Sequence, residues 1–116
     1  MRKYFIVLSM AMGLLIACSP KIGALTQADA DKIASAYPGT TLAELKEGKT
    51  LYETHCNACH ALKNPTSMSA AGWAKIVPPM VEGTNKKAGK QVINAKQETI
   101  IIKYLAAVCE KKVEKK

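Results

Sequence analysis

Two cysteines and a histidine stand at a spacing that could support chemistry: Cys56, Cys59 and His60, in the stretch Cys-Asn-Ala-Cys-His. Three chemistries use such a set, namely a zinc site, a redox-active dithiol and the thioether attachment of haem c. Each needs different surroundings, so the flanking elements and the destination of the chain decide between them.

The residues around the motif favour haem attachment. A zinc site would have to include His55, because the chain has two histidines in all, and neighbouring residues do not readily converge on one tetrahedral ion. A thioredoxin-like dithiol lies at a helix N-terminus near a βαβ pattern, whereas here an amphipathic helix precedes the motif and no strand-like alternation is present. Haem c uses all three residues, because the cysteines form two thioethers and the histidine lies beneath the iron. We therefore expect one covalently bound haem c with His60 as an iron ligand.

The N-terminus predicts export. Arg2 and Lys3 precede an apolar run over 4–17 that is too short for an anchor helix. Leu15-Ile16-Ala17-Cys18 resembles the lipobox of bacterial lipoprotein precursors, which implies cleavage before Cys18 and lipidation of its thiol. The alternative is a buried apolar helix that happens to contain a cysteine. We expect a lipoprotein on the periplasmic face of a bacterial membrane.

The remaining 99 residues, 18–116, suffice for one small domain. They contain four aromatic residues, which suggests that something besides side chains fills the core. Residues 61–116 contain eleven lysines against four glutamates, and no arginine follows Arg2. Lysine without arginine suits long-range steering better than forked recognition of phosphate, so nucleic acid is not an expected partner.

Helical periodicity and capping signals predict an all-α chain. A first helix begins at Thr26 and ends near residue 36, before Pro38-Gly39. A second begins at a capping box of Thr41 with Glu44 and runs to residue 54 or 56.

Two further helices are expected after the motif. Ser69 or Thr66 caps a helix over 70–77, which ends or kinks at Pro78-Pro79, and 83–90 is a polar loop. Asn94 and Gln97 open the last helix, which runs through Val108. The charged tail, 111–116, is expected to be frayed and solvated.

With these elements, the chain resembles the small class I cytochromes c. Family members have a glycine and an aromatic residue in the helix before the motif, matched by Gly48 and Tyr52, and an aromatic residue with a leucine in the last helix, matched by Tyr104 and Leu105. The resemblance implies about four helices around the haem, with a close helix crossing at the glycine. It divides the chain into a signal peptide (1–17), an anchor, tether and short helix (18–40), a cytochrome domain (41–110) and the tail.

The resemblance also implies a second iron ligand. Trp73, Val77 and Met80 match a Trp-x-x-x-Val-x-x-Met arrangement of short single-haem members whose methionine binds iron. Met80 is therefore the expected ligand, Met68 is its rival, and either could instead fill space in the core. Trp73 is expected to bind the haem by packing or through a propionate, with an ordinary core role as the alternative.

Two other side chains remain. His55 could reach an iron ligand position, but its place beside Cys56 favours a side chain that points to solvent. Cys109, at the end of the last helix, is expected to be a small buried hydrophobic residue, with an exposed thiol that forms a dimer as the alternative.

The expected function is one-electron transfer between redox partner proteins at the membrane, without enzymatic activity. Lysines within 63–96 either guide acidic partners or only solubilise the surface. The alternatives are a haem subunit of a larger oxidoreductase, or an open iron that binds a gas or supports peroxidase-like chemistry.

Overall fold

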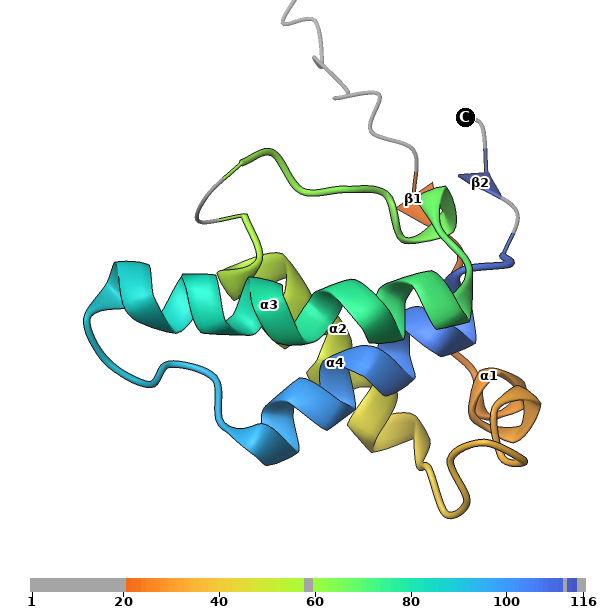
Figure 1. Cartoon of the computed structure of the whole chain (residues 1–116). Coiled ribbons are helices and arrows are strands. Elements are labelled where there is room, and N and C mark those ends of the chain that lie inside the picture. The colour runs from red at the N-terminus through yellow and green to blue at the C-terminus, as the bar shows by residue number, and fades with distance from the viewer. Residues whose placement is uncertain (1–20, 58–59, 112, 115–116) are drawn as a thin grey trace, which may run out of the picture.

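The structure, a computed structural model, describes residues 21–57, 60–111 and 113–114. Most of this part is helical, in α1 (Gln27–Lys32), α2 (Leu42–His55), α3 (Ala70–Ala88) and α4 (Ala95–Val108) (Figure 1). The 3₁₀ turn η1 (Pro65–Ser67) precedes α3, and two strands of two residues, β1 (Lys21–Ile22) and β2 (Val113–Glu114), pair antiparallel. The expected all-α class with about four helices is confirmed.

Some of the expected features lie outside the described residues. These are the signal peptide, the lipidation site Cys18 and the second cysteine of the motif, Cys59. Within the part that is described, no helix has the length and apolar character needed to cross a membrane.

Both central helices begin where their capping boxes predict. The Thr41 hydroxyl accepts the N–H of Glu44, and the Glu44 carboxylate accepts the N–H of Thr41, both at 3.1 Å. Asn94 and Gln97 make the same reciprocal pair at 2.9 Å at the start of α4. Each pair satisfies N–H groups that a helix leaves without a partner in its first turn, so both starts are defined locally.

α2 and α4 cross at a single glycine. A Cβ added to Gly48 would lie 2.6 Å from the carbonyl oxygen of Ile100 and 2.6 Å from the Cβ of Tyr104. No larger residue fits there unless one of the two backbones moves. The close crossing that the resemblance implied is thus present in the structure.

α3 continues through the proline pair, so the helix does not end at 78–79, and the expected loop over 83–90 is wrong. Trp73, Val77, Val81 and Thr84 form a buried stripe at helical spacing, and α3 packs on α4. Pro78 and Pro79 are exposed, so the carbonyl groups one turn before them lie on the solvent side, where water can replace the missing N–H donors. The buried stripe offsets the cost of the prolines, and α3 ends only at Gly89, whose φ of 69° is left-handed.

Asn85 explains why the segment after α3 is ordered. Its amide oxygen accepts the N–H groups of Val92 (2.8 Å) and Ile93 (2.9 Å), and its amide nitrogen donates to the carbonyl of Ile93 at 2.9 Å. These three bonds fix the chain between α3 and α4.

α1 is shorter than expected. It ends at Lys32 rather than near residue 36, because the chain turns after Ile33. The carbonyl of Ile33 accepts the N–H groups of Ala36 at 3.1 Å and Tyr37 at 2.8 Å.

The start of the C-terminal tail is held to the fold, which corrects the expectation of a solvated tail from residue 111. The ammonium of Lys111 donates to the Asp29 carboxylate at 2.8 Å and to the carbonyl of Ala24 at 3.1 Å. β1 and β2 pair Lys21 with Glu114 and Ile22 with Val113. We call this pairing, together with the bonds of Lys111, the terminal clamp.

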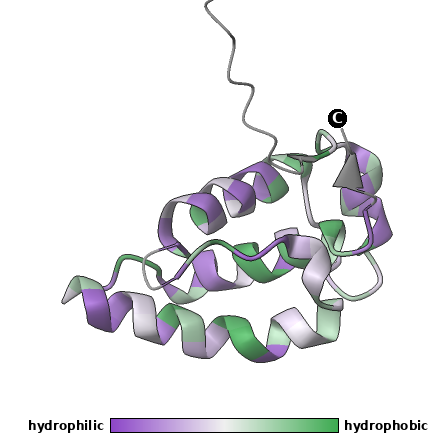
Figure 2. Ribbon diagram, turned by 90° about the horizontal axis from the view of Figure 1, so that it is seen from above, coloured by the Kyte–Doolittle hydropathy of each residue, from purple (hydrophilic) through white to green (hydrophobic). Residues whose placement is uncertain are grey.

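The core of the described part consists of side chains from all the longer helices. Figure 2 shows hydrophobic and hydrophilic residues following one another along each helix, as expected where one face is buried. The scarcity of aromatic residues therefore does not leave this core unfilled, because aliphatic side chains pack around three buried aromatic residues, Tyr52, Trp73 and Tyr104. The largest fully buried residues are Trp73, Tyr52, Leu45, Ile93, Ile101, Leu105 and Val108.

Candidate haem site

Cys56 directly follows α2 and is its C-cap. Its N–H donates to the carbonyl of Tyr52 at 3.1 Å, and the residue is 7% exposed. Burial raises the pKa of its thiol to about 11. A redox-active dithiol needs the opposite shift, so this environment does not favour that alternative for Cys56.

His60, the last residue of the motif, lies outside the helices and is exposed. Its Nδ1 is 2.8 Å from the carbonyl oxygen of Ala61. Because a carbonyl oxygen only accepts, Nδ1 carries a proton, and in the neutral ring Nε2 then has the lone pair. Histidines that bind metals usually have this arrangement, in which a backbone carbonyl fixes the ring and the other nitrogen serves as ligand.

Tyr52 and Trp73 hold the far end of this loop. Their rings meet edge to face, with centroids 5.9 Å apart and planes at 82°. The Tyr52 hydroxyl donates to the carbonyl of Lys63, and the Trp73 indole N–H donates to the carbonyl of Pro65 at 2.7 Å. The two helices thus fix the chain three and five residues after the histidine.

These bonds define what Trp73 does in the fold. The residue is fully buried, and its indole N–H already has the carbonyl of Pro65 as acceptor. The expected hydrogen bond to a propionate would therefore require this bond to break. The core role describes Trp73 in the structure, and contact between its ring and a haem stays a prediction.

The two candidate methionines occupy different settings. Met68 precedes α3 and packs partly buried against the core. Met80 is half-buried within α3, seven residues after Trp73 and four before Thr84, so it lies on the same side of the helix as these two buried residues. The Thr84 hydroxyl donates to the Met80 carbonyl at 2.9 Å. Met68 has a packing role of its own, which leaves Met80 as the better candidate.

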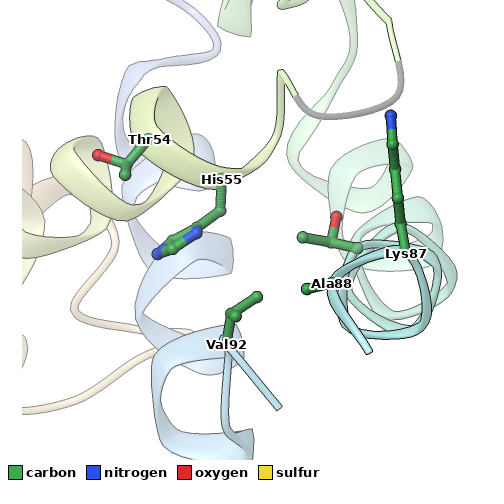
Figure 3. A pocket seen from close by; sticks show the side chains of 6 residues that line it. Thr54, His55, Lys87, Ala88 and Val92 are labelled. Atoms are coloured by element: carbon green, nitrogen blue, oxygen red, sulfur yellow. The ribbon is translucent and has the colours of Figure 1, made fainter. Parts of the chain in front are cut away.

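A pocket opens between the C-terminal ends of α2 and α3 (Figure 3). Its volume is about 200 Å³, below the roughly 300–1,000 Å³ typical of ligand sites. None of Cys56, His60, Trp73 and Met80 lines it, although His55 adjoins Cys56 in the chain and Thr84 follows Met80 by one helical turn. Polar, basic and small apolar residues line the pocket. They are Thr54, His55, Thr84, Lys87, Ala88 and Val92.

The position of His55 corrects the expectation that it points to solvent. His55 is half-buried and is one of the residues that line the pocket, on the side opposite the end of α3 (Figure 3). The sequence does contain a signal for this position, because His55 follows the buried Tyr52 by three residues and so lies on nearly the same face of α2. Thr84 was also missed, since the expected loop over 83–90 hid its place one turn after Met80.

The described residues fit a covalently held haem in their chemistry. A buried thiol ends α2, an imidazole with a free Nε2 follows it, and a thioether lies on the inner side of α3. No group of three or more His, Cys, Asp or Glu suited to a metal ion occurs in the described residues. No hydrogen bond or ring contact given for these residues joins His60 to Met80, so their convergence on one iron stays a prediction.

Cys109 is the last of the cysteines. It is buried at the end of α4, and its thiol donates to the carbonyl of Ala106 at 3.4 Å. The expected small buried hydrophobic residue is confirmed, and the thiol is not exposed for dimer formation.

Comparison of this chain with protein-family models, with curated proteins and with solved structures gives no match. The likeness to class I cytochromes c therefore rests on the residues themselves: the Cys-x-x-Cys-His motif, the glycine at the helix crossing and the aromatic residues that surround it.

Proposed function

We propose that this protein is a membrane-anchored cytochrome with one haem c, which carries one electron at a time between redox partners. The observation that carries the proposal is the Nδ1–H bond of His60, which leaves Nε2 available directly behind the cysteine pair. The close crossing of α2 and α4 at Gly48 supports it, because that crossing sets the direction in which α2 delivers the motif.

When bound, haem iron supplies a one-electron redox couple. The chain would hold it by thioethers from Cys56 and Cys59, with His60 and Met80 as iron ligands. A methionine thioether favours ferrous iron and so raises the reduction potential. The buried aromatic pair of Tyr52 and Trp73 would restrict water on one side of the site. No acid–base pair or nucleophile is part of the proposal, and the protein is not an enzyme.

The proposed location is the periplasmic face of a bacterial membrane, with the lipid on Cys18. The proposed partners are redox proteins with acidic surfaces. Lys86, Lys87 and Lys90 support this, because they cluster at the end of α3 beside the pocket and their side chains are exposed. Clustered charge of one sign speeds the encounter with an oppositely charged partner.

Absorption spectra of the exported protein test the proposal. Oxidised and reduced wild-type protein is compared with Met80→Ala and with Met68→Ala as the matched control. We expect a methionine–iron charge-transfer band at the red end of the oxidised spectrum that disappears only in Met80→Ala. Loss of the band only in Met68→Ala would assign the iron ligand to Met68 instead of Met80.

Two other results would contradict the electron-carrier function or its ligands. A wild-type spectrum that lacks the band and shifts when carbon monoxide is added would indicate an open iron, and therefore gas binding or peroxidase-like chemistry. A spectrum that lacks the band, ignores carbon monoxide and changes in His55→Ala would instead assign the second ligand to His55, which already lines the pocket. A protein without haem would overturn the proposal.

A further inference from the structure

The pocket and the terminal clamp lie at opposite ends of α4. The pocket includes Val92, three residues before α4 begins, and the clamp includes Lys111, three residues after α4 ends. The 14 residues of α4 span about 21 Å at the usual helical rise. Figure 1 places the end of α3 on one side and the paired strands on the other.

The clamp fixes the place where the chain leaves the fold toward its N-terminus. The side chains of Asp29 and Lys111 are 9% and 19% exposed, and their charged groups are 2.8 Å apart. The same ammonium holds the carbonyl of Ala24, and the two strands add backbone pairing. β1 is therefore attached to the end of α4 and is not a free tether.

Covalent geometry then limits how far the clamp can be from a lipid on Cys18. Lys21 is three positions after Cys18 in the sequence. Consecutive Cα atoms are about 3.8 Å apart, so the Cα atoms of these two residues are at most about 11 Å apart in any conformation. A lipid on Cys18 would keep the clamp close to the head groups.

We propose that the anchor orients the domain, with the terminal clamp toward the membrane and the pocket between α2 and α3 toward water. The electron partner is then a water-exposed protein rather than a quinol embedded in the lipid. This rests on the proposed function, since it takes Cys18 as the lipid site and the pocket as the end where electrons are exchanged. The exposed lysines at the end of α3 agree with it, because they suit an acidic surface approached through water.

Spin labels measure the orientation directly. The full-length, haem-loaded lipoprotein with Cys109→Ser receives one nitroxide, through Ala28→Cys beside the clamp or Gln91→Cys beside the pocket; both positions are exposed. The spin relaxation of each nitroxide is measured in vesicles with and without nickel-chelating lipids. The haem iron contributes equally in both, so the difference reports only the relaxation caused by nickel at the membrane surface. We expect nickel to relax the label at position 28 several-fold more strongly than the label at position 91.

A variant without the clamp is the matched control. Asp29→Asn with Lys111→Met keeps the lipid but removes the ion pair, and we expect the difference between the two labels to shrink. Equal relaxation at both positions in the clamped protein overturns the proposal, and so does an unchanged difference in the variant. Failure to bind vesicles also overturns the proposal. The absorption spectrum of the same sample tests the proposed haem function independently of the orientation.

Electron transfer provides a second readout. The lipidated protein and its Cys18→Ser form are each reduced by a quinol in vesicles, and ferricyanide in water serves as the soluble oxidant. We expect lipidation to leave both rates nearly unchanged. A several-fold faster reaction of the lipidated protein with the quinol would show the exchange site facing the membrane and would overturn the assignment of the partner.

Discussion

α2 contacts α4 and α3 in different ways. Against α4 it leaves no room for a methyl group at Gly48, where an added Cβ would approach backbone and side-chain atoms to 2.6 Å. Against α3 it makes the ring contact of Tyr52 with Trp73, and beyond that contact the ends of the helices separate around a pocket of about 200 Å³. The interface of α2 with α4 is therefore closely packed, while the interface of α2 with α3 leaves a pocket.

This difference suggests separate roles for the two regions: the crossing of α2 and α4 supports the fold, and the ends of α2 and α3 belong to the proposed binding site. The crossing of α2 and α4 can set the direction of the motif because close-packed backbones do not slide freely. Under the proposed function, the ends of α2 and α3 would accommodate the haem, because the pocket lies where these helix ends are already apart. Substitutions in the first region should therefore change stability, and those around the second should change ligation or electron transfer.

The largest effect is expected at the crossing. Gly48→Ala places a Cβ against the Ile100 carbonyl, and we expect the free energy of unfolding to fall by about 2–3 kcal/mol, typical of overpacking. Gly83→Ala is the matched control, because it also lies within a helix but has no atom within 4 Å of the added Cβ. The free energy of unfolding of Gly83→Ala should rise by up to about 1 kcal/mol, because alanine has a higher helix propensity than glycine. Urea unfolding of both variants measures the difference, and equal effects would mean that the crossing is not tight.

A smaller effect is expected where the two regions meet. Trp73→Phe keeps an aromatic ring in the core but leaves the carbonyl of Pro65 without its indole donor. We expect a loss of about 1–2 kcal/mol, the cost of an unpaired buried acceptor, measured by denaturant unfolding. The absorption spectrum should keep the methionine–iron band. Loss of that band with little change in stability would instead indicate that Trp73 acts on the haem.

The ion pair of the terminal clamp should contribute about 1 kcal/mol to the free energy of unfolding. This value lies between those of exposed ion pairs and those of buried ion pairs. Burial alone would raise the pKa of Asp29, but the bonds from Lys111 and Thr26 outweigh it and lower the pKa below its usual value of 3.8. A lowered pKa stabilises the fold above pH 3.8, and this contribution is lost as the pH falls through the folded-state pKa. The difference in stability between wild type and Asp29→Asn should therefore shrink below about pH 4. A difference independent of pH would show that the carboxylate charge is not what stabilises the clamp.

Local signals in the sequence predicted the closely packed interface well. The capping boxes of Thr41 and Asn94 define the starts of α2 and α4 within four residues of chain. The crossing at Gly48 was implied by the resemblance to class I cytochromes c, and the structure contains it. His60 was predicted as a ligand from the spacing of the motif, and Met80 from the same resemblance. Their meeting on one iron remains a prediction.

The features that were missed depend on contacts between distant residues. The rule that prolines end a helix is local, and it failed at 78–79 because the stripe from Trp73 to Thr84 is buried elsewhere in the fold. The clamp joins Lys111 to a residue 82 positions earlier, which no periodicity can show. His55 lines the pocket only because α3 extends far enough to form the opposite wall.

The smallest effect is expected from the lysines at the end of α3. Lys86→Glu with Lys87→Glu should slow electron transfer to an acidic partner about threefold at low salt, since an exposed charge pair contributes up to about 1 kcal/mol. The change should vanish at high salt, where the Debye length falls to about 3 Å at 1 M. Lys46→Glu with Lys49→Glu, on the exposed side of α2, changes the net charge equally and is the matched control. If the lysines beside the pocket steer the partner, only the variant with Lys86→Glu and Lys87→Glu transfers electrons more slowly. Equal slowing in both variants would show that only the net charge of the protein matters. Unchanged rates in both would show that the lysines only make the surface soluble.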